Sequence, residues 1–317
     1  MATAFEGRPA RVLGVRDLTP DIREFEIAPE GGIAPAASGA HLKIRVLIDG
    51  RPDTRSYSIV ETNPRGYRIA VKRLPQSRGG STYMHTLAPG ARLDISGPHN
   101  HFALRLGAPD YLLVAGGIGI TPIHAHALAL AKAGANFRLL YGVRARADLA
   151  LAPSLGARLE TFVGAEGRRI DFANEFARLA PEGEAYVCGP VPMLEAAKRA
   201  WAAAGRRMDM LRFETFGASG AWPTTSFRVH IPRLGRDIFV ATGKTILQAL
   251  EDAGIAMIFD CRKGECGLCA LPVLAVDGVI DHRDVFFSDA ERAANDRICT
   301  CVSRVHGASI SLDTSDR

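Results

Sequence analysis

Four cysteines in the last third of the chain have the spacing of iron–sulfur ligands. Cys261, Cys266 and Cys269 form a C-x₄-C-x₂-C pattern, and Cys301 follows at a distance. Four thiolates can hold two irons and two bridging sulfides, and this spacing is typical of a plant-type [2Fe–2S] site. Glycines inside the loop let the backbone curl around the inorganic core. Such a cluster moves one electron at a time, so we expect the rest of the chain to deliver single electrons to it.

Zinc is the alternative occupant of these cysteines. Structural zinc sites usually pair two cysteine knuckles, and the sequence contains neither a second knuckle nor a histidine pair. Cys299 and Cys301 lie two residues apart, so in an extended segment both face the same side, and only one is needed. The segment around them resembles the end of ferredoxin-like domains, in which the cysteine directly before Val-Ser-Arg ligates iron. This resemblance favours Cys301 and leaves Cys299 as a small buried side chain.

Length and composition limit the remaining possibilities. The chain has 317 residues, 47% hydrophobic and 23% charged, which is ordinary for two or three globular domains. No apolar run reaches the roughly 18 residues of a membrane span, and the first residues form no signal peptide. We therefore expect a cytoplasmic protein without a membrane partner. The net charge is +5, but no basic run with interleaved aromatic residues indicates nucleic acid.

The first hundred residues predict an antiparallel β-barrel. Short alternating segments are separated by turn residues rich in Gly, Pro and Asp, which is the strand signature. These segments begin at Ile22, Leu42, Ser56 and Tyr67. Two of the motifs in this region could do chemistry, namely Arg55-Ser56-Tyr57-Ser58 on a strand and Arg78-Gly79-Gly80-Ser81 before a predicted helix at 82–87.

Each of these two motifs also has an ordinary structural explanation, as a solvent-facing strand and as a turn that caps a helix. Together they meet the needs of a flavin mononucleotide (FMN). A helix start with small residues binds phosphate through its amides, Ser81 adds a hydrogen bond, and Arg55 supplies the opposite charge. The Tyr57-Ser58 pair can lie along a planar ring and bond its edge.

The middle third predicts an α/β nucleotide-binding domain. The apolar run 111–115 is followed by a glycine turn that contains Gly117, Gly119 and Thr121, and then by a helix at 123–133. The predicted strands that follow lie at 137–142, 159–163 and 184–189. Cys188-Gly189-Pro190 opens a further helix at 191–204, at the carboxyl end of a strand, where α/β sheets bind their ligands.

The motifs occur in an order that resembles the phthalate dioxygenase reductase family. They are Arg-Ser-Tyr-Ser, Arg-Gly-Gly-Ser, Ala-Gly-Gly-Ile-Gly-Ile-Thr-Pro, Val-Cys-Gly-Pro, Phe-Glu-Thr-Phe and the cysteine set. The resemblance implies three domains: a ferredoxin-reductase-like antiparallel barrel for FMN, a parallel-sheet α/β domain for NADH, and an α+β plant-type ferredoxin of the β-grasp fold. The corresponding ranges are 1–105, 106–216 and 227–317, with a linker at 217–226.

The resemblance also implies roles for individual residues. Arg55, Ser56, Tyr57 and Ser58 would hold the flavin, with its phosphate on Gly79, Gly80 and Ser81. Lys72 either faces the flavin or is a solvated strand lysine. Gly117, Gly119, Thr121 and Arg144 would bind the nucleotide, and Cys188, Gly189 and Pro190 would border the nicotinamide. Glu214 and Phe216 match the Glu-x-Phe of the family near the flavin, and Ser58, Cys188, Glu214 and Phe216 form the expected catalytic set, although Phe216 could also be plain core.

Two features remain open at this stage. His99 and His101 follow Gly97-Pro98, where the family often carries an arginine, and their role is undefined. Arg144 and Arg146 lie where an arginine can bind the 2′-phosphate of NADPH. No acidic residue that would read a ribose 2′-hydroxyl is evident nearby, and NADH is favoured only because the family implies it.

The parts together predict an electron-transfer reductase. Nicotinamide gives up a hydride, a [2Fe–2S] cluster accepts one electron, and FMN can exchange both. The expected acceptor is a Rieske non-haem-iron oxygenase, because nothing in the chain could bind a carbon skeleton or activate oxygen. Two alternatives are a stand-alone diaphorase or ferric reductase with a small-molecule acceptor, and a redox sensor that binds NAD.

Overall fold

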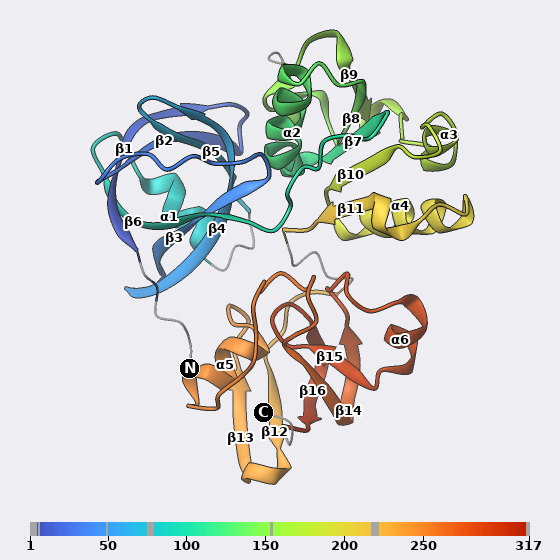
Figure 1. The fold of residues 1–317 in the computed structure, drawn as a ribbon. Helices are drawn as coiled ribbons and strands as arrows, with labels where there is room; N and C mark the ends of the chain where they lie inside the picture. Colours follow the sequence, from blue (N-terminus) through green and yellow to red (C-terminus); the bar gives the residue numbers. More distant parts are fainter. Residues whose placement is uncertain are drawn as a thin grey trace. The chain divides into compact units, whose positions relative to one another are not determined.

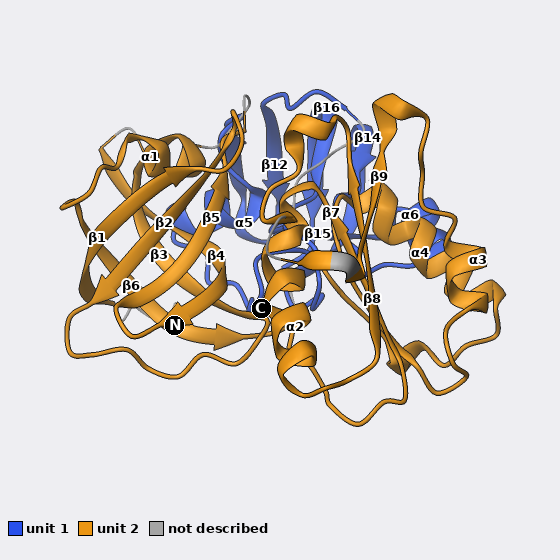
Figure 2. Ribbon diagram, turned by 90° about the horizontal axis from the view of Figure 1, so that it is seen from above, with its two compact units in different colours: residues 1–2, 215–317 blue, residues 3–214 orange. Residues whose placement is uncertain are grey.

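The computed structural model describes residues 5, 7–48, 50–74, 79–152, 155–216 and 222–314. Its contacts divide the chain into two compact units, residues 3–214 and 215–317 (Figure 2). We describe each unit separately and call them the reductase unit and the ferredoxin unit. Arg78 and residues 217–221 of the predicted linker lie outside the described residues. Within the described residues, no helix has the length and apolar character needed to cross a membrane.

The reductase unit begins with a closed antiparallel barrel (Figure 1). Its strands pair in the order β1-β2-β5-β4-β3-β6, and their inward side chains, such as Phe25, Ile44 and Ile69, are fully buried. Alternation of apolar and polar residues along each strand produces this arrangement. The short helix α1 (Gly80–Thr86) packs against β3 and β5. The strands are β1 (Arg8–Asp17), β2 (Ile22–Pro29), β3 (Ala40–Ile48), β4 (Arg51–Asn63), β5 (Gly66–Lys72) and β6 (Arg92–Asn100).

A parallel sheet with the order β11-β10-β7-β8-β9 follows the barrel. Its strands are almost continuously apolar because helices cover both faces of such a sheet. All the paired strands run in the same direction, so their carboxyl ends share one edge. The elements are β7 (Tyr111–Gly116), α2 (Ile120–Lys132), β8 (Phe137–Val143), β9 (Leu159–Val163), α3 (Phe172–Ala177), β10 (Glu184–Cys188), α4 (Val191–Ala203) and β11 (Leu211–Glu214).

The barrel and the parallel sheet share a hydrophobic core. Ile22, Val60 and Phe102 of the barrel side belong to the same buried cluster as the β7 and α2 side chains. The segment that joins the two is fixed by hydroxyl groups of the sheet. Tyr186 accepts a hydrogen bond from the backbone N–H of Arg105 at 2.8 Å, and Tyr111 donates to the carbonyl oxygen of the same residue at 3.0 Å. Barrel and sheet therefore form one packed body.

The buried His126 of α2 lies inside this shared core. Its ring is 4.9 Å from that of Phe102 and 5.0 Å from that of Tyr186, measured between centroids. Burial lowers the pKa of His126 to about 3, so the imidazole is neutral and acts as a packing group at physiological pH.

The ferredoxin unit contains a mixed sheet with the order β13-β12-β16-β14-β15. β12 and β16 are parallel, and the other paired strands are antiparallel. Thr245 begins α5 with a capping box, in which its hydroxyl accepts from the Gln248 N–H and the Gln248 side chain accepts from the Thr245 N–H. The elements are β12 (Phe227–Ile231), β13 (Arg236–Val240), α5 (Ile246–Asp252), β14 (Ala270–Asp281), α6 (Asp289–Ala294), β15 (Arg297–Cys299) and β16 (Arg304–Leu312).

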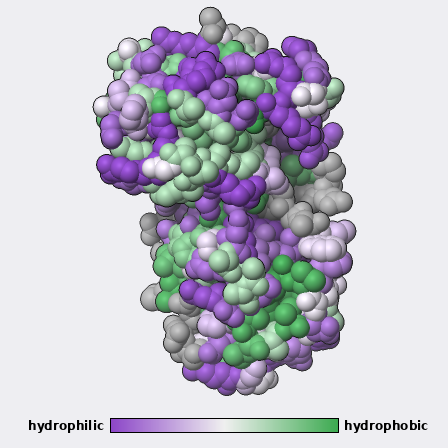
Figure 3. Space-filling view, turned by 90° about the vertical axis from the view of Figure 1, so that its right-hand side faces the viewer, coloured by the Kyte–Doolittle hydropathy of each residue, from purple (hydrophilic) through white to green (hydrophobic). Residues whose placement is uncertain are grey.

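Hydrophobic side chains gather on one face of the ferredoxin unit (Figure 3). The exposed large apolar residues of this unit include Leu274, Val276 and Val279 of β14. They stand outside the buried core formed by residues such as Val229 and Ile310.

The fold class predicted from the sequence is confirmed in all three parts, and each predicted segment is found within a few residues. The predicted helix at 123–133 begins earlier, at Ile120, because the glycine turn passes directly into it. The domain boundary at 105/106 stays a prediction, since the contacts group the barrel with the parallel sheet. Strands β1, β6, β11, β14, β15 and β16 were not predicted.

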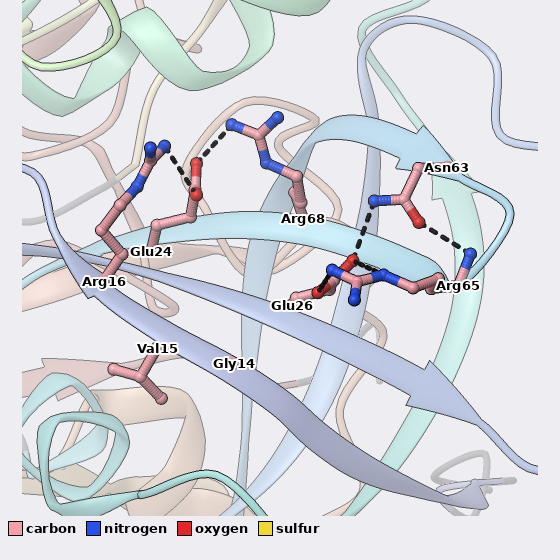
Figure 4. Close-up of a pocket in the computed structure, with 8 residues that line it drawn as sticks. All are labelled: Gly14, Val15, Arg16, Glu24, Glu26, Asn63, Arg65 and Arg68. Atoms are coloured by element: carbon pink, nitrogen blue, oxygen red, sulfur yellow. Dashed lines mark hydrogen bonds and ion pairs between the residues drawn. The ribbon is translucent and has the colours of Figure 1, made fainter.

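A hollow of about 370 Å³ on the barrel surface is lined by charged side chains (Figure 4). Glu24 of β2 accepts hydrogen bonds from Arg16 of β1 at 2.9 Å and from Arg68 of β5 at 2.6 Å. Arg68 also pairs with Glu61 of β4, and Glu26 pairs with Arg65. Acids and bases satisfy one another here, so this network ties the barrel strands together rather than forming a ligand site.

Replacement of Glu24 should destabilise the barrel. Glu24→Ala removes the carboxylate from two arginines, one of which is largely buried, and we expect a loss of about 2–3 kcal/mol in unfolding free energy. The measurement is the thermal midpoint at which flavin is released. The control is Asp17→Ala, which breaks the exposed Asp17–Arg23 pair and should leave the midpoint nearly unchanged. Equal midpoints for the two variants would contradict the structural role of Glu24.

Candidate functional site

The structure brings the predicted cluster cysteines together in the ferredoxin unit. Cys261 and Cys266 are partly exposed, whereas Cys269 and Cys301 are buried. The Cys261 sulfur accepts hydrogen bonds from the backbone N–H groups of Lys263, Glu265 and Cys266, each at 3.4 Å. The loop therefore wraps around the Cys261 sulfur with its amides pointing inward.

Mutual hydrogen bonding makes two of these thiols acidic. The Cys301 thiol, aided by the loop amides, lowers the pKa of Cys261 to about 5. The Cys299 and Cys301 thiols lower the pKa of Cys269 to about 3. As the proton-holding partners in these contacts, Cys299 and Cys301 have raised pKa values. Soft sulfur donors within contact of one another fit an iron–sulfur cluster.

Two glycines of the cluster loop are required by close packing. Gly264 has φ +77°, and a Cβ there would lie 2.6 Å from a methyl carbon of Val302. Gly267 has φ +73°, and a Cβ there would lie 2.3 Å from the ring of Phe286. Both positions therefore exclude a side chain by space as well as by backbone conformation.

Buried polar residues fix the turn that carries Cys301. Asp284 is fully buried and accepts hydrogen bonds from the Phe287 N–H and the Ser303 hydroxyl, both at 3.0 Å. Its pKa is lowered by hydrogen bonds from His282, Phe287 and Ser303 against the opposing effect of burial, which is the largest contribution. The Thr300 hydroxyl donates to the Cys269 carbonyl at 2.8 Å. The backbone on both sides of Cys301 is thus held in place.

The predicted flavin residues lie on β4 of the reductase unit. Arg55 forms an ion pair with Asp53 at 2.7 Å and donates to the Thr54 carbonyl at 2.9 Å. Tyr57 is half-buried, and burial raises the pKa of its phenol, so it stays protonated. Ser58 is buried and Ser56 is exposed. This pattern gives a cation, an aromatic ring and a hydroxyl along one strand.

The predicted phosphate loop contacts the same arginine. Gly79, at φ +86°, precedes α1, whose start has no side-chain cap. A Cβ on Gly80 would lie 2.6 Å from the Arg55 side chain, so the backbone and the guanidinium chain are in direct contact. Ser81 accepts a hydrogen bond from the Leu74 N–H at 3.3 Å. Amides beside an arginine suit an anionic group, and this cradle fits the phosphate of a flavin nucleotide.

The predicted nicotinamide residues meet at the carboxyl edge of the parallel sheet. Cys188 is the last residue of β10 and is paired in register with Ala115 of β7 and Glu214 of β11. Both Cys188 and Glu214 are buried. A Cβ on Gly119 would lie 2.2 Å from the Cys188 carbonyl oxygen, and one on Gly189 would crowd Met193 and Gly116. The two glycine turns can therefore approach each other only without side chains.

The turn before α2 leaves room for a nucleotide. Gly117 has φ +53° and open space where a Cβ would point, and the α2 start has no side-chain cap. The Thr121 hydroxyl donates to the Ile118 carbonyl at 3.0 Å. It therefore stabilises the turn. Pro190 is the N-cap residue of α4, and its ring fixes the backbone of the second turn at φ −60°.

Two other predicted residues, Lys72 and Phe216, lie in different surroundings from each other. Lys72 forms an ion pair with Asp21 at 3.0 Å, which agrees with its interpretation as a surface strand lysine. Phe216 belongs to the ferredoxin unit and is 40% exposed, so it is not a core residue.

The histidines after Gly97 form a small aromatic group. The rings of His41 and His101 stack at 5.4 Å between centroids, and His99 bonds the Ser96 hydroxyl at 3.0 Å. Burial lowers the pKa of His99. This group is a structural feature of β3 and β6.

Sequence reasoning missed two acidic residues near the predicted sites. Glu166, which follows β9, forms a two-pronged ion pair with Arg146, at 2.9 and 2.7 Å. Glu265, inside the cluster loop, accepts a hydrogen bond from the backbone N–H of Thr215 at 2.7 Å. Neither contact has a local sequence signal, because the partners lie 20 and 50 residues apart.

The fold and these sites define an oxidoreductase that contains flavin-binding and [2Fe–2S] parts. Residues 10–104 match the model of the oxidoreductase FAD-binding domain, and residues 229–306 match that of the 2Fe-2S iron-sulfur cluster binding domain. Both matches coincide with the barrel and the ferredoxin sheet.

Known relatives align with nearly the whole chain. Phenoxybenzoate dioxygenase subunit beta of Ectopseudomonas oleovorans is 42% identical and covers 92% of this chain and 93% of its own. The beta subunit of a heme-dependent oxidative N-demethylase of Ectopseudomonas mendocina is 38% identical, over 96% and 97%. The structure of phthalate dioxygenase reductase, described as modular for electron transfer from pyridine nucleotides to [2Fe–2S], matches with a TM-score of 0.78 at 30% identity, over 97% and 98%. The chain belongs to the phthalate dioxygenase reductase family.

The choice between Cys299 and Cys301 can be tested directly. We expect Cys301→Ser to abolish the visible iron–sulfur absorption and its EPR signal, because a ligand is lost. Cys299→Ser should keep both, since Cys299 is not a predicted ligand and a serine hydroxyl can still donate to the Cys269 sulfur. Retention of the cluster in the Cys301 variant, with loss in the Cys299 variant, would reverse the assignment.

Gly119→Ala should impair reduction by the nicotinamide without removing the cofactors. The added Cβ meets a main-chain carbonyl, so the turn must shift, and a displacement near 1 Å can slow a positioned reaction by about a hundredfold. Rapid mixing with NADH measures the rate of flavin bleaching. The control is Gly14→Ala, where the nearest atom to the new Cβ is a Glu26 carboxyl oxygen at 3.9 Å. A normal bleaching rate in Gly119→Ala would show that this turn is not at the reacting ring.

Proposed function

We propose that the chain is the NADH-dependent reductase component of a Rieske non-haem-iron oxygenase, and that it uses FMN and a [2Fe–2S] cluster. The observation that carries the proposal is that one chain holds a glycine-lined nucleotide edge, a flavin-type barrel and a loop of converging thiols. A bound flavin supplies the conversion between hydride and single-electron transfer. The residues of this chain bind, orient and shield the carriers.

The nucleotide edge supports the binding of a dinucleotide. Gly117 and the uncapped start of α2 offer amides and open space for the pyrophosphate. Cys188 and Glu214 end neighbouring strands, so their side chains border the same part of the edge. Both are buried, and a buried border excludes water from the place where a hydride would move. No residue there is required as an acid or a base.

The barrel supports FMN as the flavin. Arg55 and the Gly79–Gly80 backbone form one compact anion cradle at the start of α1, and a single phosphate is the group that such a cradle suits. Tyr57 and Ser58 lie beside it on the same strand and can contact the ring. The contacts among the predicted cysteine ligands support the cluster, because thiolates from all of them can reach one centre.

The proposal that the acceptor is of the Rieske type rests on the family. Curated relatives include reductase subunits of carnitine monooxygenase from Escherichia coli and Acinetobacter baumannii, at 32% and 31% identity. The heme-dependent demethylase relative makes a haem oxygenase the competing partner. Tetrachlorobenzoquinone reductase of Sphingobium chlorophenolicum, at 37% identity, favours a second candidate function, the reduction of a small quinone.

Three measurements on the purified protein test the proposal. Chromatography of the released flavin should give FMN, and FAD would contradict the proposed identity of the flavin. NADH should bleach flavin and cluster in succession. The reduced protein should then transfer electrons to its native partner, isolated by pull-down, faster than to a quinone, and the spectrum of that partner should show a Rieske centre. A haem spectrum, or faster transfer to the quinone, would contradict the proposed partner. Neither result would contradict the proposed electron carriers.

A further inference from the structure

We infer that Glu166 makes the nucleotide site selective for NADH by holding Arg146 away from a 2′-phosphate. The inference rests on the proposed function, because it concerns the same nucleotide edge. In α/β nucleotide domains, the adenosine ribose is read near the end of the strand beside the glycine turn, by a carboxylate for a 2′-hydroxyl or by an arginine for a 2′-phosphate. In this chain, one residue of each kind meets at that place.

Two neighbouring strands bring Glu166 and Arg146 together. β8 and β9 are parallel and in register from Leu139 with Leu159 to Val143 with Val163. The residues that follow them therefore leave the sheet side by side. The backbone N–H of Ala165 donates to the Arg144 carbonyl at 2.9 Å, which links the two loops.

The backbone around Glu166 is fixed. A single turn of 3₁₀ helix spans Gly164–Glu166 and is closed by Gly167, whose φ of +74° is in the left-handed region. The Gly167 N–H donates to the Gly164 carbonyl at 3.0 Å, and the Arg168 N–H donates to that of Val163 at 3.2 Å. The carboxylate is thus presented to the β8 loop by the turn itself.

Arg146 contacts Glu166 through the same edge of its guanidinium group that a phosphate would bind. Nε and Nη2 of Arg146 donate to the two carboxylate oxygens of Glu166, at 2.9 and 2.7 Å. This is the fork geometry by which arginine binds phosphate oxygens. Both side chains are substantially exposed, 67% for Arg146 and 40% for Glu166. The pair is therefore accessible to a ligand and contributes little to stability.

The charge of Glu166 discriminates between the two nucleotides. A 2′-phosphate beside Glu166 meets a like charge and an arginine whose donors are occupied, whereas a 2′-hydroxyl can donate to the carboxylate. Arg144 forms no ion pair with any described residue and so adds positive charge to this edge. Glu166 is a specificity residue that acts partly through Arg146. Its negative charge opposes the binding of NADPH, which the two arginines would otherwise favour.

The test uses the holoenzyme and two probes, adenosine 2′,5′-bisphosphate and adenosine 5′-diphosphate, in a calorimetric binding assay. Glu166→Gln should raise the affinity for the bisphosphate by about tenfold or more relative to that for the diphosphate, because a like charge is removed and the Arg146 donors are released. The double variant Glu166→Gln with Arg146→Ala should lose this gain. Rates of flavin reduction should shift toward NADPH in the same direction.

Glu160→Gln is the matched control. Glu160 lies on β9, near the end of the strand away from Glu166, and likewise pairs with an exposed arginine, Arg168, at 3.1 Å. It should leave the preference for the probes unchanged. The inference is overturned if Glu166→Gln does not change the preference, if Glu160→Gln changes it equally, or if the wild type already prefers the bisphosphate. NADH-driven bleaching of the wild-type flavin tests the proposed function independently of these outcomes.

Discussion

The packing of an antiparallel barrel and a parallel sheet around one core is the constraint on which the reductase unit depends. A flavin site on β4 and a nucleotide site at the end of β7 can act together only if the bodies that carry them do not move apart. The ring of Phe102 packs against the rings of His126 and Tyr186, and this contact joins the barrel side to the sheet. The hydroxyls of Tyr111 and Tyr186 bond the backbone of the connecting segment at Arg105 and so fasten this segment to the sheet. Rigid placement is what the hydride transfer that we propose requires of these two sites.

The ferredoxin unit has a different structural requirement, because it must hold four cysteine sulfurs close together. Thiolates repel one another, and the loop amides directed at the Cys261 sulfur offset this repulsion. Gly264 and Gly267 permit the required path by lying directly against Val302 and Phe286. The buried Asp284 and its partners then hold the distant Cys301 at the same place. Local chain geometry supplies three of the ligands, and the tertiary fold supplies the fourth.

The sequence was sufficient to predict the three folds, because strand alternation, glycine turns and cysteine spacing are local signals. The register that pairs Cys188 with Glu214 was not predicted, because strand β11 was not recognised in the sequence. Nor was the sequence sufficient for contacts that depend on how distant segments meet. The Arg146–Glu166 pair arises from the register of β8 and β9, and the Glu265–Thr215 contact from the path of the cluster loop. Strands such as β1 and β16 were missed because they mix polar and apolar residues on partly exposed faces.

The three amides directed at the Cys261 sulfur also have a thermodynamic consequence. An electron added to the iron–sulfur core increases negative charge on its thiolates, and N–H groups that already point at a sulfur stabilise that charge. Hydrogen bonds of this kind raise the midpoint potential of a cluster. Because the donors at Lys263, Glu265 and Cys266 are main-chain groups, substitution of the Lys263 or Glu265 side chain leaves them in place. The loop surface can therefore diversify between homologues while the driving force for electron uptake stays nearly constant.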